Sequence, residues 1–98
     1  MEISARRRLE IIEREVIPSM FVGVLSKDDR WLEHTLNETL PALEMKALHL
    51  AKECMEKKEC EKDDPLCDEA RIRSLFKETH SKLEKEHLVR ESQTRFPH

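Results

Sequence analysis

The sequence predicts an all-α protein, and three features of its composition and spacing favour this fold class. The 98-residue chain has one glycine, no tyrosine, one tryptophan and three phenylalanines, so it has few of the residues that β-sheets prefer. Charged residues make up 40% of the chain, and most are the lysine, arginine and glutamate typical of long helices. Apolar residues recur every three or four positions, which is the period of one helix face. We expect one domain over residues 1–90 and a frayed polar tail over residues 91–98.

A short first helix is predicted near the N-terminus. Ser4 is suited to be its N-cap, and Pro18 is expected to end it because the residue before a proline disfavours the helical conformation. The apolar segment 20–25 is expected either to form a buried short helix or to fold back onto the core as a connector. The apolar positions of the first helix lie on one narrow face, as in a coiled-coil seam; they are Ala5, Leu9, Ile12 and Val16.

A long second helix is predicted over residues 27–61. Its apolar positions keep one phase across Pro41, which favours a single helix kinked near residues 37–41 over two separate helices. The alternative is a break at this point, with Thr39 capping a new helix that begins at Pro41. The apolar stripe that supports one helix consists of Leu32, Leu36, Leu40, Leu43, Ala47, Leu50 and Cys54.

A last helix is predicted over residues 65–90. Asp64 is a suitable N-cap, and the fixed φ and missing N–H of Pro65 suit the first helical position. The last two helices would form a long antiparallel helical hairpin, which the short first helix completes as a small helical bundle. The expected apolar face of the last helix consists of Ile72, Leu75, Phe76, Thr79 and Leu83.

Three cysteines lie within fourteen residues around the turn of this hairpin. Cys54 belongs to the apolar stripe and is expected to fill the core as a small apolar side chain. Cys60 and Cys67 flank the turn outside the core, so they form a possible redox pair that could be bridged. Helical-hairpin proteins of the mitochondrial intermembrane space carry such bridges, but a second bridge would need a cysteine near Arg73, where the chain has none. The Cys-x5-Cys-x6-Cys spacing does not match common zinc sites, and no metal is predicted.

Nothing in the sequence predicts an enzyme or a cofactor. One glycine cannot build a phosphate-binding loop, and no serine lies in a nucleophile-elbow motif. The five histidines are scattered without the spacing of metal ligands. We therefore expect no catalytic residues and no cofactor.

The charge pattern argues against nucleic acid and membrane partners. The net charge is −3, and the single basic cluster, Arg6, Arg7 and Arg8, is followed closely by three glutamates. Nucleic-acid binding through these arginines is therefore only the weaker alternative. The chain has neither a run of 18 apolar residues nor a signal-peptide core. We expect an intracellular protein, cytoplasmic or nuclear, with the intermembrane space as the lesser alternative.

Some apolar residues lie outside or at the edge of the predicted helix faces and are candidates for an interface. Methionine makes adaptable contact surfaces, and tryptophan is a frequent interface anchor. We therefore predict a non-enzymatic interaction or assembly module that binds another helical chain or a second copy of itself. The alternative is a thiol-switched or disulfide-stapled hairpin that uses Cys60 and Cys67. The interface candidates are Trp31, Met45, Leu48, Met55, Leu66 and Leu88.

Overall fold

The computed structural model describes residues 3–95, and every regular element within that range is helical. The all-α prediction is confirmed. Three long helical segments follow one another, with a connector after the first and a loop before the last. The elements are α1 (Ala5–Ile11), η1 (Ile12–Val16), α2 (Ile17–Ser19), η2 (Val24–Ser26), α3 (Asp29–His34), η3 (Thr35–Thr39), α4 (Leu40–Glu56), η4 (Pro65–Cys67) and α5 (Glu69–Arg95).

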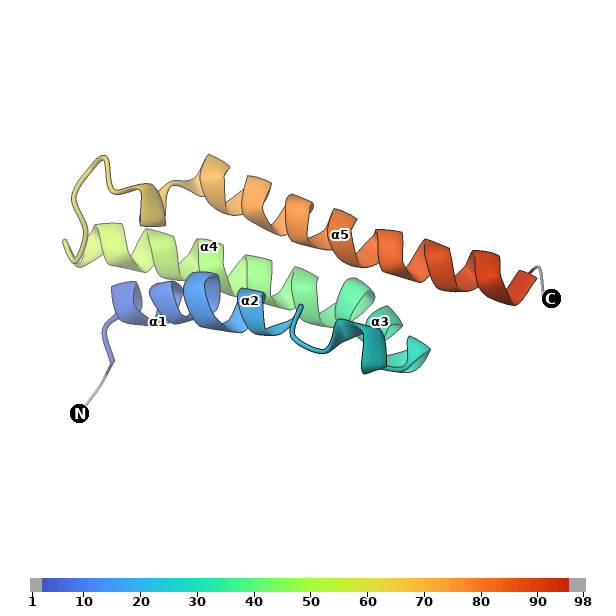
Figure 1. Cartoon of the computed structure of the whole chain (residues 1–98). Helices are drawn as coiled ribbons and strands as arrows, with labels where there is room; N and C mark the ends of the chain where they lie inside the picture. The colour runs from blue at the N-terminus through green and yellow to red at the C-terminus, as the bar shows by residue number, and fades with distance from the viewer. Residues whose placement is uncertain (1–2, 96–98) are drawn as a thin grey trace.

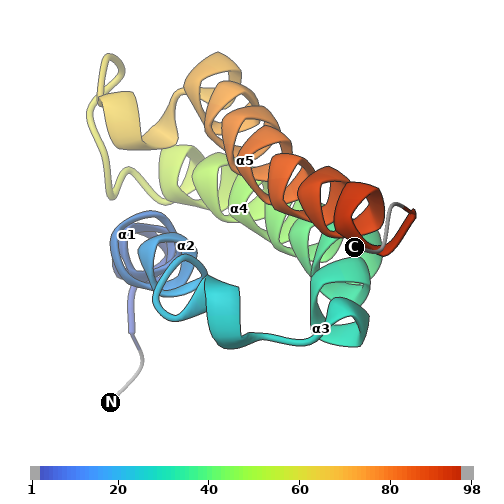
Figure 2. The same ribbon diagram turned by 45° about the vertical axis from the view of Figure 1, so that its right-hand side comes forward.

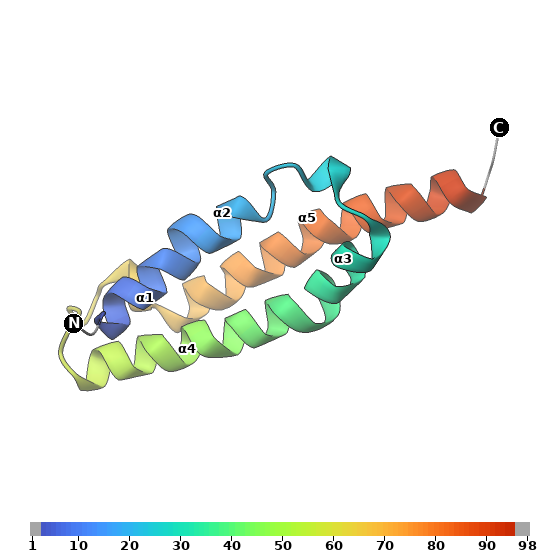
Figure 3. The same ribbon diagram turned by 90° about the horizontal axis from the view of Figure 1, so that it is seen from below.

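Helix α4 is the central element of a three-helix arrangement (Figure 1). Helix α1 packs along one side of α4, with α2 continuing from it through η1, while α5 runs antiparallel to α4 along another side, which confirms the predicted hairpin. Figure 2, in which the right-hand side of Figure 1 comes forward, shows α4 between α1 and α5. Figure 3 shows that the last turns of α5 extend past α3. The result is an elongated bundle measuring 58 × 28 × 18 Å.

Two of the three helical segments contain a π-helical stretch that ends two residues before a proline. In the first segment, η1 joins α1 to α2 without a break, and the N–H of Ile17 donates to the carbonyl of Ile12, five residues back. A wide turn of this kind relieves the clash between a proline ring and the carbonyl of the preceding turn. The prediction that Pro18 ends this helix is therefore wrong, since α2 includes Pro18 and continues to Ser19.

A π-helical stretch likewise allows the second segment to continue through Pro41. Helices α3 and α4 are continuous through η3, in which the N–H of Leu40 donates to the carbonyl of Thr35. The predicted single helix across Pro41 is confirmed, and the alternative break with Thr39 as a cap is wrong. Thr39 has helical φ and ψ and makes no side-chain capping hydrogen bond.

The second segment ends at Glu56, five residues before the predicted end at residue 61. Lys58 adopts φ 56°, the left-handed conformation that usually requires glycine. The N–H of Glu59 donates to the Cys54 carbonyl at 2.9 Å, and the N–H of Lys58 donates to the Met55 carbonyl at 3.3 Å. These two bonds form a Schellman motif. The sequence did not predict this helix end because lysine occupies the position where glycine is the usual signal.

The last helix begins later and ends later than predicted. The Asp64 side chain acts as an N-cap as expected, but the element that it caps is the 3₁₀ turn η4. The extended backbone of Asp68 then separates η4 from α5. The Asp68 carboxylate accepts from the N–H of Ala70 at 3.0 Å, so Asp68 starts α5. Helix α5 continues to Arg95, so residues 91–95 of the predicted tail are helical, and residues 96–98 lie outside the described residues.

The core forms where the three helical segments meet. Cys54 is fully buried, as predicted from the apolar stripe. The connector is only partly buried: Met20 packs into the core, whereas Val22 and Leu25 are exposed. The buried apolar residues are Ala5, Leu9, Ile12, Ile17, Met20, Leu32, Leu36, Leu40, Ala47, Leu50, Ala51, Cys54, Leu66, Ile72, Phe76 and Leu83.

Candidate functional site

The three cysteines form a thiol cluster at the end of the bundle where α4 meets η4. The sulfur atoms of Cys54, Cys60 and Cys67 all lie within 4.8 Å of one another. Cys54 comes from the last turn of α4, Cys60 from the loop after it, and Cys67 from η4. All three are free thiols. The sequence predicted Cys60 and Cys67 as a pair apart from Cys54, but the fold brings all three together.

Two local structures bring Cys60 back towards Cys54. The Schellman turn at Lys58 reverses the chain directly after α4, so Cys60 does not continue along the helix surface. Arg6 of α1 then holds both sides of the loop. Its backbone N–H donates to the Glu59 carboxylate at 3.1 Å, and its Nε donates to the Asp64 carboxylate at 3.0 Å. The prediction that Cys60 lies outside the core is wrong: Cys60 packs, partly buried, against the core, because α4 ends at Glu56 and does not continue to residue 61.

Burial keeps the thiols of Cys54 and Cys67 in their neutral form. Cys54 is fully buried, whereas Cys60 and Cys67 are partly exposed. The pKa of Cys54 is raised to about 11, mainly by burial and to a smaller extent by the neighbouring Cys60 thiol. Burial and the two neighbouring thiols raise the pKa of Cys67 even further above its ordinary value. At neutral pH these two sulfurs are thiols rather than thiolates, which are the reactive form.

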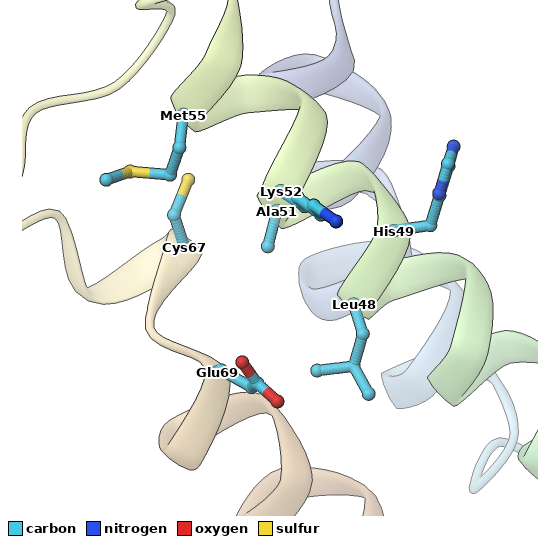
Figure 4. Close-up of a pocket in the computed structure, with 7 residues that line it drawn as sticks. All are labelled: Leu48, His49, Ala51, Lys52, Met55, Cys67 and Glu69. Atoms are coloured by element: carbon cyan, nitrogen blue, oxygen red, sulfur yellow. The ribbon is translucent and has the colours of Figure 1, made fainter.

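A fourth sulfur atom lies beside the thiol cluster. The Cys60 sulfur is 3.4 Å from the thioether sulfur of Met55, which comes from the last turn of α4. Figure 4 shows the Met55 and Cys67 side chains extending into the same space between α4 and η4, whereas the His49 ring points away from it. Among the histidine, cysteine, aspartate and glutamate side chains of the described residues, the three cysteines are the group that could hold a metal ion.

A surface hollow gives access to this cluster from one side. It lies between α4 and the start of the last helical segment (Figure 4). Small or apolar side chains form part of its wall, and His49, Lys52 and Glu69 supply polar groups at its edge. The residues that line it are Leu48, His49, Ala51, Lys52, Met55, Cys67 and Glu69.

The predicted interface candidates fall into three groups by burial. Met45, Met55 and Leu88 are exposed, with 74%, 43% and 54% of their surfaces accessible. Trp31 and Leu48 are partly buried against the core. Leu66 is only 4% exposed and belongs to the core, so its prediction as an interface residue is wrong. The reason is that η4 turns Leu66 inward towards the bundle, whereas the prediction placed it on the outer side of a continuous helix.

Three of these candidates lie on one side of α4. Met45, Leu48 and Met55 are spaced by three and seven residues, which places them on one side of the helix. We call these three residues the methionine face. The methionine face merges with the hollow, because Leu48 and Met55 also line it.

Two of the three N-terminal arginines, Arg6 and Arg7, pair with acidic residues of the same chain. Arg6 pairs with Asp64 and Glu10, and Arg7 pairs with Glu10 and Glu15. These contacts reduce the positive charge that the cluster could offer to phosphate groups. They therefore argue against nucleic-acid binding through Arg6 and Arg7.

Sequence reasoning missed a buried ion pair that joins the first helical segment to the last. The Glu13 carboxylate, only 2% exposed, accepts a hydrogen bond from Arg71 of α5. Burial raises the pKa of Glu13, while the hydrogen bond and charge of Arg71 oppose that rise. The signal for this pair was the spacing of Leu9, Glu13 and Ile17, which lie four residues apart across η1 and are all buried.

Searches for related proteins add no family or function to this description. No protein-family model, no curated protein and no solved structure matches the chain. Within residues 3–95, none of the helices combines the length and the apolar character needed to cross a membrane.

Proposed function

We propose that this protein is a non-enzymatic assembly module that uses its methionine face to bind a helix of a second chain. The partner that we propose is another copy of the same chain. The observation that carries the proposal is the exposure of Met45 and Met55 on the same side of the central helix. Such side chains contribute to binding by removing about 25 cal/mol per Å² of apolar surface from water. Methionine also adapts its shape to a partner at little cost.

The shape of the bundle supports this proposal. Its radius of gyration is 16.0 Å, compared with about 13 Å for a compact domain of roughly 100 residues. An elongated chain of this size leaves more of its helix sides exposed than a compact one does.

The experiment is the mass in solution of the full chain, measured by light scattering after size exclusion over a range of concentrations. Reductant and a metal chelator are present, so that neither disulfides nor metal ions can join two chains. We expect a dimer of about twice the 11.7 kDa chain mass. Met45→Glu should weaken the dimer at least about tenfold, which corresponds to 1.4 kcal/mol.

Ser74→Glu is the matched control, because it adds the same charge at an exposed position on α5. It should leave the mass unchanged. A parent chain that stays monomeric at every concentration refutes self-association. A dimer that Met45→Glu does not weaken refutes the methionine face as the contact surface.

The thiol cluster favours a second candidate function, a thiol switch. Cys60 and Cys67 would each lose one hydrogen to hydrogen peroxide, forming one disulfide while the peroxide is reduced to two molecules of water. The support for this candidate is the mutual distance of the sulfurs, all within 4.8 Å. In chelator, mild peroxide should lower the chain mass by two hydrogens and raise the melting temperature. A parent chain that keeps three free thiols under peroxide would rule this function out.

A further inference from the structure

We propose that Cys54, Cys60 and Cys67 form a binding site for one Cu(I) ion, with the thioether of Met55 as an additional ligand. The site does not require the proposed assembly, because all four sulfurs belong to one chain, although Met55 also belongs to the methionine face. The proposal rests on the convergence of four sulfur donors at the closed end of the hairpin.

The distances require little rearrangement. Sulfurs bound to one metal ion at about 2.3 Å lie about 3.8 Å apart when the geometry is tetrahedral. The three cysteine sulfurs are already within 4.8 Å of one another, so movements of about an ångström would bring them to that separation. Cys60 lies in a loop and Cys67 in a 3₁₀ turn, so neither is held rigidly by a long helix. Cys54, on α4, is the fixed ligand.

The kind of donor selects the kind of ion. Thiolates and thioethers are soft ligands that favour Cu(I) over hard cations such as Mg²⁺ and Ca²⁺. A structural zinc site takes four nitrogen or sulfur ligands, in sets such as four cysteines or three cysteines and a histidine. The nearest histidine in the hollow, His49, points away from the sulfurs (Figure 4). The fourth donor here is a thioether, which suits Cu(I).

The surroundings can admit the ion and hold the site together. Cys67 and Met55 line the surface hollow, which provides a path from solvent. Arg6 holds the loop that carries Cys60 through Glu59 and Asp64, and its positive charge lies close enough to interact with Cys67. On binding, each cysteine coordinates as a thiolate and its proton passes to water.

The test is an anaerobic titration of the reduced full chain with Cu(I), in competition with the chelator bicinchoninate. We expect one Cu(I) per chain, a thiolate-to-copper charge-transfer absorption in the ultraviolet and a rise in melting temperature. Cys60→Ser and Cys67→Ser should each weaken binding more than about 100-fold, because the loss of an outer-sphere partner alone costs about 10- to 100-fold. Met55→Leu should weaken it less, and Met45→Leu, on the same helix, should not change it.

Several outcomes would overturn the proposal. No bound Cu(I) in the presence of the competitor, or equal affinity in the cysteine variants, would remove the site. One ion per two chains would show a bridge between chains instead of a site within one chain. Zn(II) that displaces bound Cu(I) would overturn the choice of ion. Circular dichroism of each variant checks that the helices persist. Cys60 and Cys67 are both partly exposed, so the test does not depend on a substitution of the buried Cys54.

Discussion

Removing Arg71 tests the buried ion pair most directly. Arg71→Met keeps a long, partly exposed side chain on α5 but leaves the Glu13 carboxylate, which is 2% exposed, without its charged partner. The other oxygen of this carboxylate already has no hydrogen-bond partner among the described residues. An unpaired buried carboxylate is strongly destabilising. We therefore expect a large loss of stability at neutral pH.

Protonation limits the size of this loss. The carboxyl group can take up a proton instead of staying charged, and from the ordinary pKa of 4.5 this costs about 3.4 kcal/mol at pH 7, at 1.36 kcal/mol per pH unit. Burial already raises the pKa of Glu13 in the parent, so part of this cost is present before the substitution. We expect Arg71→Met to lower the free energy of unfolding by about 2 kcal/mol at pH 7. At pH 5 the same limit is only about 0.7 kcal/mol.

The sign of the pH dependence follows from the direction of the pKa shift. An acid with a raised pKa in the folded state binds its proton more tightly there than in the unfolded chain. The free-energy cost of keeping the Glu13 carboxylate buried therefore grows as the pH rises from 4.5 through the raised pKa. This cost becomes smaller as the pH falls. Urea unfolding at pH 7 and pH 5, followed by circular dichroism, measures the difference between Arg71→Met and the parent at each pH.

Arg73→Met is the matched control. Arg73 lies two residues further along α5 and pairs with Glu69, and both side chains are more than half exposed. Exposed pairs contribute about 0–1 kcal/mol, so we expect a change below about 0.5 kcal/mol at both pH values. The reasoning is refuted if Arg71→Met costs as little as this control, or if its cost at pH 5 equals its cost at pH 7.

Three further predictions concern the end of α4, the proline inside the second helical segment and the connector. Lys58→Gly should stabilise the protein by about 0.5–1 kcal/mol in urea unfolding, because glycine adopts the left-handed conformation without strain; Lys57→Gly, at a negative φ, should not stabilise it. Pro41→Ala should change the free energy of unfolding by less than about 1 kcal/mol, because the wide turn before it has already relieved the clash that costs about 3 kcal/mol in a regular helix. Arg90→Met should speed amide hydrogen exchange in residues 24–27 but not in residues 47–54, because Arg90 donates to the carbonyls of Val24 and Lys27.

The sequence was sufficient to predict the helices and their order because the apolar spacing depends directly on burial. Leu32, Leu36 and Leu40 are all buried, and their phase continues along α4. The same spacing also indicates the π-helical stretch. Two successive steps of four residues drift by about 80° on a regular α-helix, and the π-helical stretch η3 absorbs this drift. Leu9, Glu13 and Ile17 show the same spacing across η1.

The thiol cluster could not be predicted from spacing alone. Its assembly depends on the left-handed conformation of Lys58, a position where the sequence has no glycine to indicate it. It also depends on contacts from Arg6, more than fifty residues earlier in the chain. Helical-wheel reasoning assigns Cys60 a direction only while the helix lasts, and α4 ends four residues before it. The exposure of Met45 was easier to predict, because a regular helix fixes which side of α4 it occupies.

The pairing of each π-helical stretch with a following proline has an evolutionary consequence. A π-helical turn is equivalent to a one-residue insertion in an α-helix, so deleting the exposed residue Glu38 would restore a regular helix with its apolar phase intact. The ring of Pro41 would then clash with the preceding turn, at a cost of about 3 kcal/mol. The deletion should thus be tolerated only together with Pro41→Ala. Insertion and proline are therefore epistatic: a lineage that lost the inserted residue would be selected to lose Pro41, whereas loss of the proline alone would be nearly neutral.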